Sequence, residues 1–267
     1  DVFGAPLAME ALLAFFVEST FLGLWIFGWD RLPKRAHLAV IWVAVIGSIL
    51  SAYFIIVANS WMQHPVGIEL VDGRPRMNDA WAVFTNNTAM IAFPHVIFGS
   101  FMVGGALLIG ISWYHLWRRR ADGVDTVGPD GRVVVGDQPK IPGRDKTDHA
   151  VWLSSLRTGV AIALLAGIAV VITGDRQGKL MFQQQPLKMA SAEGACDSGT
   201  ELSLLTIGDP ASNSCDDVRT LIGIPGMLSF LAHGDFDTPV LGVTELDPQY
   251  QEEFGRYLPD DPRLGER

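Results

Sequence analysis

The chain of 267 residues has few charged residues and almost no cysteine. Charged residues make up 18% of it, whereas 49% of it is hydrophobic. This composition excludes an intrinsically disordered chain, which combines low hydrophobicity with high charge. The net charge of −9 argues against nucleic acid as a partner, because nucleic acid selects basic surfaces. Two cysteines are too few for a disulfide-rich scaffold or a four-cysteine zinc site.

The negative charge is confined to one part of the chain. Residues 1–174 contain 13 acidic and 13 basic side chains, whereas residues 175–267 contain 16 acidic and 7 basic ones. We therefore expect two regions, 1–174 and 175–267. The chain begins at Asp1 without the pattern of a signal peptide, which suggests a piece of a longer protein.

Four apolar stretches are long enough to cross a bilayer, which takes ~20 apolar residues. They cover residues 7–27, 38–59, 88–117 and 151–173. The pattern predicts an all-α integral membrane helix bundle, with residues 175–267 as an ordered domain outside the membrane. Buried helices of a large soluble protein are the alternative, but the charged flanks of these stretches favour membrane spans.

The basic residues of the links predict the orientation. Residues 30–37 contain three basic side chains and residues 118–146 contain seven, whereas residues 60–87 contain two. Because Lys and Arg favour cytoplasmic loops, we expect the two basic links, 30–37 and 118–146, to be cytoplasmic. Residues 60–87 and the acidic region 175–267 then lie on the extracytoplasmic side.

The first two spans contain polar residues that hydrocarbon disfavours. Glu10 and Glu18 lie in the first span, Ser19 follows Glu18, and Ser51 lies in the middle of the second span. Carboxylates in spans usually face a bundle interior and carry function, and a series of carboxylates and hydroxyls suits proton conduction. In a regular α-helix the two glutamates would lie about 80° apart around the axis. Alternatively, Glu10 lies in the outer interface and is solvated.

His95 is the one histidine set within a span. An imidazole there could relay protons, bind haem iron, or be a packing histidine with its hydrogen bonds satisfied. Pro94 precedes it and is expected to kink the helix. If His95 binds haem, Met90 and Met102 cannot reach the opposite face of the iron from the same helix. The haem would then be five-coordinate or take its second ligand from another segment.

Cys196 and Cys215 lie in the region expected outside the membrane. That compartment is oxidising in most bacteria, so we expect a disulfide between them, with two free thiols as the alternative. Zinc is not expected, because no histidine lies near either cysteine in the sequence.

Several motifs, taken together, resemble subunit I of cytochrome bd quinol oxidase. They are GAPLAME (4–10), FFVEST (15–20), GWDR (28–31), ANSWMQHP (58–65), the sequence around FPH (93–95) and GDRQGKLMFQQQPLKMASAE (174–193). They follow one another in family order and cover nearly the whole chain. The paired cysteines and the QQQPLKMASAE segment look most like the actinobacterial version of the family.

The resemblance implies a terminal oxidase of the bacterial plasma membrane. Such an enzyme oxidises ubiquinol or menaquinol on the outer side and reduces O₂ to water with protons from the cytoplasm. The family carries a low-spin haem b, a high-spin haem b and haem d, and assembles with a subunit II in the lipid membrane.

The resemblance also implies roles for individual residues. His95 matches an axial ligand of the low-spin haem b, and Glu10 matches a glutamate beside the high-spin b and d pair that can ligate iron or donate a proton. Glu18, Ser19 and Ser51 match residues of the family's proton path. Asn59 and Trp61 match a cofactor-binding signature. Lys188 and Glu193 match residues of the quinol loop.

The family has about nine spans, whereas this sequence has four. The haem d histidine, the second ligand of the low-spin haem and the glutamate helix of the high-spin haem have no match in it. The chain is therefore expected to be an internal fragment that cannot by itself hold the complete haem set. Without the resemblance, a proton-coupled transporter or channel subunit, or a haem-binding electron-transfer anchor, would also fit.

Overall fold

The computed structural model describes residues 4–71, 74–123, 125–136, 147–208, 215 and 218–254. Contacts between Cα atoms divide the chain into two units. The first contains residues 1–58 and 89–174, and the second contains residues 59–88 and 175–267. The second unit thus includes residues 59–88, which the sequence analysis treated only as a link between spans.

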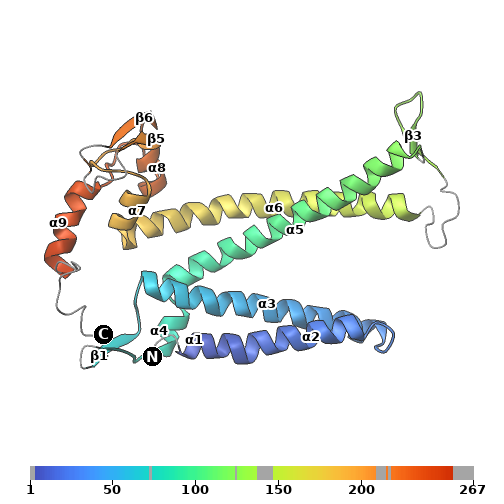
Figure 1. Ribbon diagram of the computed structural model, residues 1–267, viewed down its shortest axis with the longest axis horizontal. Coiled ribbons are helices and arrows are strands. Elements are labelled where there is room, and N and C mark those ends of the chain that lie inside the picture. Colours follow the sequence, from blue (N-terminus) through green and yellow to red (C-terminus); the bar gives the residue numbers. More distant parts are fainter. Residues whose placement is uncertain are drawn as a thin grey trace. The chain divides into compact units, whose positions relative to one another are not determined.

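Four helical segments are long and apolar enough to cross a membrane, as predicted (Figure 1). The first runs through α1 (Gly4–Met9), η1 (Glu10–Phe15) and α2 (Phe16–Phe27). The others are α3 (Lys34–Gln63), α5 (Asn87–Ala121) with the short α4 (Ala80–Phe84) before it, and α6 (Thr147–Gln184). The all-α membrane fold is confirmed. Pro94 does not end α5, which continues through it.

The segment η1 is a π-helix between the two glutamates of the first span. A π-helix forms i→i+5 hydrogen bonds, so each residue turns the chain less than in an α-helix. The offset of about 80° between Glu10 and Glu18, which assumed α geometry throughout, is therefore wrong. The wider turn brings the two positions closer to one face.

Glycines allow the helices of the first unit to pack closely in pairs. A methyl group at Gly47 of α3 would lie 3.0 Å from the backbone nitrogen of Glu18. A methyl group at Gly105 of α5 would lie 2.8 Å from the backbone nitrogen of Ala163 on α6. Small residues at such crossings let the backbones of membrane helices approach each other. These contacts fix α3 against the first span and α5 against α6.

Three antiparallel hairpins complete the fold. In the first unit, β3 (Asp125–Val127) pairs with β4 (Val133–Val135) in the link between α5 and α6. In the second unit, β1 (Ile68–Val71) pairs with β2 (Arg74–Met77), and β5 (Leu202–Ile207) pairs with β6 (Arg219–Ile224).

The second unit also has a small apolar core. It contains α7 (Pro186–Ala192), α8 (Met227–His233) and α9 (Val243–Phe254) beside the end of α6. Phe182, Leu228, Ala232 and Val240 form the core. Within the described residues, the region after the fourth span thus forms regular elements through the end of α9.

Candidate functional site

The side chain of His95 is held by the neighbouring helix α6. Its Nδ1 atom lies 3.1 Å from Oγ1 of Thr173. That hydroxyl also lies 2.7 Å from the carbonyl oxygen of Ala169, and when it donates its hydrogen there it accepts one from His95. In that arrangement Nδ1 carries the proton, and Nε2 keeps its lone pair. Among the described residues, nothing forms a hydrogen bond with Nε2.

Gly174 gives the imidazole the room it needs beside α6. A methyl group at this position would lie 3.2 Å from Cε1 of His95 and 3.6 Å from Nδ1. The ring thus packs directly against the α6 backbone next to the hydrogen-bonding Thr173. The ring orientation is set by packing and by a hydrogen bond at the same time.

This arrangement fits a haem ligand. Histidines that bind metals usually donate the proton of one ring nitrogen to a nearby acceptor and bind through the other. No group of three or more His, Cys, Asp or Glu side chains that could hold a metal ion occurs in the part of the chain that the structure describes. Haem iron needs no such group, because the porphyrin supplies four of its ligands and a single histidine can supply another.

The structure connects Glu10 with Ser51. The Ser51 hydroxyl on α3 lies 3.3 Å from Oε1 of Glu10, at the start of the π-helix, and both residues are half-buried. The resemblance had grouped Ser51 with Glu18. π-Helical turns often occur at functional sites, which supports a role for this pair.

The other residues of the expected proton path are placed differently. Glu18 is half-buried, and its backbone lies against Gly47. Ser19 is exposed, and its hydroxyl donates to the carbonyl oxygen of Phe16 in its own helix at 3.4 Å. Ser19 therefore points to no partner in α3 within the described residues.

Asn59 and Trp61 lie where α3 enters the second unit. The amide oxygen of the exposed Asn59 accepts a hydrogen bond of 2.6 Å from Gln63. The indole of the buried Trp61 donates to the carbonyl oxygen of Val66 at 3.0 Å. Both side chains thus form hydrogen bonds that close the C-terminal end of α3 locally.

Lys188 and Glu193 lie on and just after the short helix α7. Lys188 is exposed, whereas Glu193 is half-buried and forms the C-cap of the helix. Their spacing of five residues puts them about 140° apart around a helix. Neither forms an ion pair with any residue that the structure describes.

Half-buried amides and a buried hydroxyl set the point where α6 ends and α7 begins. Nε2 of Gln185 donates to the carbonyl oxygen of Gln63 at 2.7 Å. Oγ1 of the buried Thr88 donates to Oε1 of Gln184 at 2.6 Å. The ends of α3 and α5 therefore position the segment that carries Lys188. The sequence analysis missed this role, although the run of three glutamines was a visible signal.

A second cation lies closer to the end of the fourth span. Lys179 forms an ion pair of 2.9 Å with Asp175, and its ammonium lies 5.9 Å from the ring centroid of Phe230. The ring of Phe230 stacks on Phe236 at 5.2 Å. This cluster joins the end of α6 to α8.

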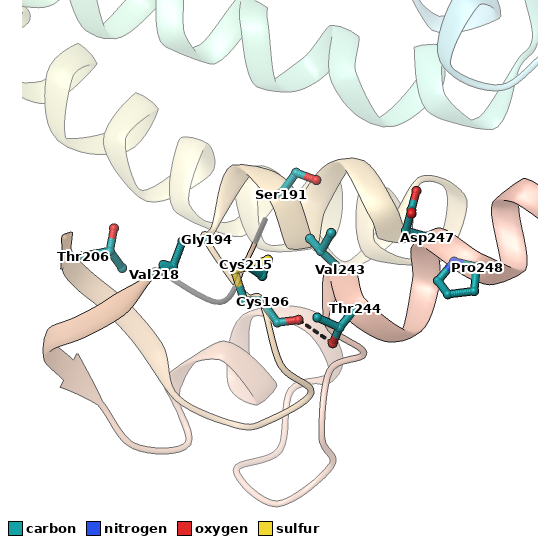
Figure 2. Close-up of a pocket in the computed structure, with 10 residues that line it drawn as sticks. All are labelled: Ser191, Gly194, Cys196, Thr206, Cys215, Val218, Val243, Thr244, Asp247 and Pro248. Atoms are coloured by element: carbon teal, nitrogen blue, oxygen red, sulfur yellow. Dashed lines mark hydrogen bonds between the residues drawn. A yellow bond between two sulfur atoms is a disulfide. The ribbon is translucent and has the colours of Figure 1, made fainter. Parts of the chain in front are cut away.

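Cys196 and Cys215 form a disulfide with 5.5 Å between their Cα atoms. The disulfide lies beside a cavity of about 600 Å³ (Figure 2). The lining of this cavity includes Ser191 of α7 and Asp247 of α9. Thr244 donates its hydroxyl hydrogen to the carbonyl oxygen of Cys196 at 2.9 Å. The disulfide thus ties the chain after α7 to Cys215, and the Thr244 hydrogen bond ties it to the start of α9.

An ionic cluster that the sequence analysis missed closes the link between α5 and α6. Oδ2 and Oδ1 of Asp125 accept hydrogen bonds from the Arg119 guanidinium at 2.9 and 3.0 Å, and Nδ1 of His149 lies 3.1 Å from Oδ2. Burial raises the pKa of the Asp125 carboxyl, but hydrogen bonds from Arg119, His149 and the Gly136 amide outweigh it, and the pKa falls below its ordinary value. The hairpin is thereby fastened to both helices.

The family profile "Cytochrome bd terminal oxidase subunit I" matches residues 1–258. The chain belongs to this family. It is 36% identical over 261 residues to the cytochrome bd ubiquinol oxidase subunit 1 of Bacillus subtilis, covering 97% of this chain and 50% of the relative. It is 34% identical over 250 residues to the cytochrome bd-II ubiquinol oxidase subunit 1 of Escherichia coli, covering 92% and 43%.

Among solved structures, the bd oxidase from Geobacillus thermodenitrificans matches this bd-family chain with a TM-score of 0.67. The sequences are 28% identical, and the match covers 92% of this chain and 50% of the other. The chain thus spans about half the length of the relatives it matches. The fold and the family expected from the motifs are both confirmed, and the chain is that of a membrane protein related to oxidoreductases.

Proposed function

We propose that this bd-family chain is part of the catalytic subunit of a quinol:O₂ oxidoreductase in a bacterial plasma membrane. The observation that carries the proposal is the hydrogen bond between Nδ1 of His95 and Oγ1 of Thr173, which leaves Nε2 with a lone pair for a ligand. A histidine with one ring nitrogen held by a hydrogen bond and the other open suits a metal ligand. Family membership supplies the reaction class.

In this proposal, Nε2 of His95 holds the low-spin haem b. Glu10 lies near the high-spin haem b and haem d, as a ligand or proton donor. The haems, when bound, supply electron transfer and the reduction of O₂. The rest of the family's length, beyond the half that this chain covers, contributes the other ligands.

Quinol oxidation is assigned to α7. A quinol that gives up two electrons also gives up two protons, and a carboxylate next to it can accept one of them. Glu193 fits that role because it is half-buried at the C-cap, and Lys188 fits as a hydrogen-bond donor to the quinol oxygen because its ammonium is exposed. The substrate is ubiquinol or menaquinol.

The protons for water formation are proposed to come from the cytoplasm. Glu18 and the Glu10–Ser51 pair are polar groups at different depths of the first two spans. A hydroxyl that donates to a carboxylate can pass a proton on by exchanging its own. Residues 175–267 then lie on the extracytoplasmic side, as their negative charge and the basic links favour.

The partners follow from the same assignment. Apolar side chains cover the outward faces of the spans, among them Leu12, Phe16, Val103 and Leu165. Lipid, the remaining part of the subunit and subunit II of the oxidase are proposed to cover these faces.

The full-length complex tests the proposal. Reduced-minus-oxidised absorption spectra should show b-type and d-type bands, and reduced quinol should drive O₂ consumption. His95→Ala should remove the low-spin b band. His115→Gln is the matched control, because this histidine of the same helix stacks on Trp152 at 4.0 Å instead. Spectra without haem bands, or an unchanged low-spin band in His95→Ala, would refute the assignment.

A further inference from the structure

A cavity of about 430 Å³ lies where α5 ends and α6 begins. Trp113 and Trp117 of α5 and Leu153 and Leu156 of α6 form much of its wall. Large apolar side chains thus face an open volume at the end of a membrane-spanning helix pair. Neither the haem sites nor the quinol loop proposed above uses this volume.

Of the charged side chains that line the cavity, Asp125 has ion-pair partners, whereas Arg120 has none among the described residues. The Asp125 carboxylate, which lines it, is already saturated by Arg119, His149 and the Gly136 amide. Arg120 also lines it, has an exposed side chain, and forms no ion pair with any residue that the structure describes. Among the described residues, the cavity therefore presents one cation without an ion-pair partner beside apolar walls.

The residues around the cavity are those expected at the depth of the lipid headgroups. Three consecutive arginines end α5, and tryptophans at positions 113, 117 and 152 surround the same level. Tryptophan collects at the boundary between hydrocarbon and water. The stack of His115 on Trp152, at 4.0 Å, holds α5 and α6 together here, so the walls do not depend on a ligand.

We propose that this cavity binds an anionic phospholipid of the leaflet that faces the α5–α6 link. The phosphate pairs with the Arg120 guanidinium, and an acyl chain lies along Leu153 and Leu156. A phospholipid satisfies both halves of the cavity, because one molecule carries the anion and the apolar chain. Basic pockets between membrane helices recognise lipid headgroups in this way.

Native mass spectrometry of the complete oxidase complex tests the proposal. Delipidated complex in detergent is titrated with phosphatidylglycerol and, separately, with phosphatidylcholine. Arg120→Gln should weaken phosphatidylglycerol binding about fivefold, which corresponds to the ~1 kcal/mol that one basic side chain contributes near an anionic lipid. Binding of phosphatidylcholine should change much less.

Arg118→Gln is the matched control. Arg118 lies two residues away on α5, is exposed, and faces Asp122 at 3.7 Å instead of lining the cavity. Its removal should leave phosphatidylglycerol affinity unchanged. Leu153→Phe, which fills the cavity without altering charge, should also reduce lipid binding.

Three outcomes would overturn the proposal. Equal phosphatidylglycerol affinities for Arg120→Gln and Arg118→Gln would remove Arg120 from any lipid site. Competition by inorganic phosphate as strong as by the lipid would show a free-anion site. A cavity filled by another segment of the complex would leave Leu153→Phe without effect on lipid binding.

Discussion

Nδ1 of His95 on α5 lies 3.1 Å from Oγ1 of Thr173 on α6, so a hydroxyl of one helix fixes the tautomer of a histidine on another. The relationship explains why one nitrogen is free for a ligand. It also makes the electronic state of that nitrogen depend on a residue 78 positions away in the sequence. A hydrogen bond at Nδ1 raises the basicity of the imidazole.

Thr173→Val should therefore alter the low-spin haem without removing it. Loss of the acceptor makes His95 a weaker donor to ferric iron, and the midpoint potential should rise. A tenfold change in the affinity of the ligand for ferric iron relative to ferrous iron corresponds to a shift of about 60 mV in the midpoint potential. Redox titration at the low-spin b band measures it. Thr173→Ser keeps the hydroxyl and should stay within a few millivolts of the wild type, whereas a matching rise in Thr173→Ser would contradict the explanation.

Ser51→Ala should slow O₂ reduction if the Glu10–Ser51 pair conducts protons. We expect a loss of about one order of magnitude in quinol-driven O₂ consumption, at the low end for a group in proton transfer. Ser48→Ala is the control, because Ser48 lies one turn away on α3 and donates to the carbonyl oxygen of Ala44 in its own helix. Equal rates for the two variants would exclude a role for Ser51.

Gly105→Ala should destabilise the pair α5–α6. The new methyl group would lie 2.8 Å from the Ala163 nitrogen and 2.9 Å from the Gly159 oxygen, both of which are backbone atoms that cannot move aside alone. Overpacking of this kind costs about 1–3 kcal/mol. Thermal unfolding followed at the haem bands measures it. The adjacent Gly104→Ala meets no atom within 4 Å and should behave as wild type.

Asp125→Asn should loosen the link between α5 and α6. The side chains of Arg119 and Asp125 are 7% and 1% exposed, so the change leaves a buried cation without its counter-ion, which costs about 3–5 kcal/mol. Hydrogen exchange in residues 125–136 should rise. Unchanged exchange would show that the hairpin does not depend on the ion pair.

The same carboxyl gives a pH dependence with a defined sign. Its pKa in the folded protein lies below the ordinary value, so the folded state favours the ionised form. The stabilisation is complete above the unfolded pKa of about 4 and is lost as pH falls through the lower folded pKa. Protection of residues 125–136 should therefore decrease in acid, and the decrease should be smaller in Asp125→Asn. An equal loss in the two proteins would argue against Asp125 as the source.

Cys196→Ser should weaken the region after α7. The disulfide spans a sequence separation of 19 residues, and the chain-entropy description assigns about 3 kcal/mol to a loop of this size. Limited proteolysis between residues 196 and 215 should become faster, and a reducing agent should have the same effect on the wild type. Resistance of both to the protease would show that the other contacts of α7 and α9 suffice.

The number and position of the membrane spans could be predicted from the amino-acid sequence alone. Each span is a long apolar run, and its length follows from the thickness of the bilayer alone. The motifs identified the family, and the resemblance to it singled out His95, Glu10, Lys188 and Glu193 as candidate site residues. These are local properties, so no knowledge of the tertiary structure was needed.

Which polar groups contact each other could not be predicted from the sequence, because helix packing brings them together. The π-helix at Glu10, the pairing of Ser51 with Glu10, and the hydrogen bond between His95 and Thr173 depend on how helices pack, which periodicity does not encode. The same holds for Arg119, Asp125 and His149, which looked like ordinary charges of a link. A charge or hydroxyl acquires its role from the atoms within about 3 Å of it, and distant parts of the chain supply those atoms.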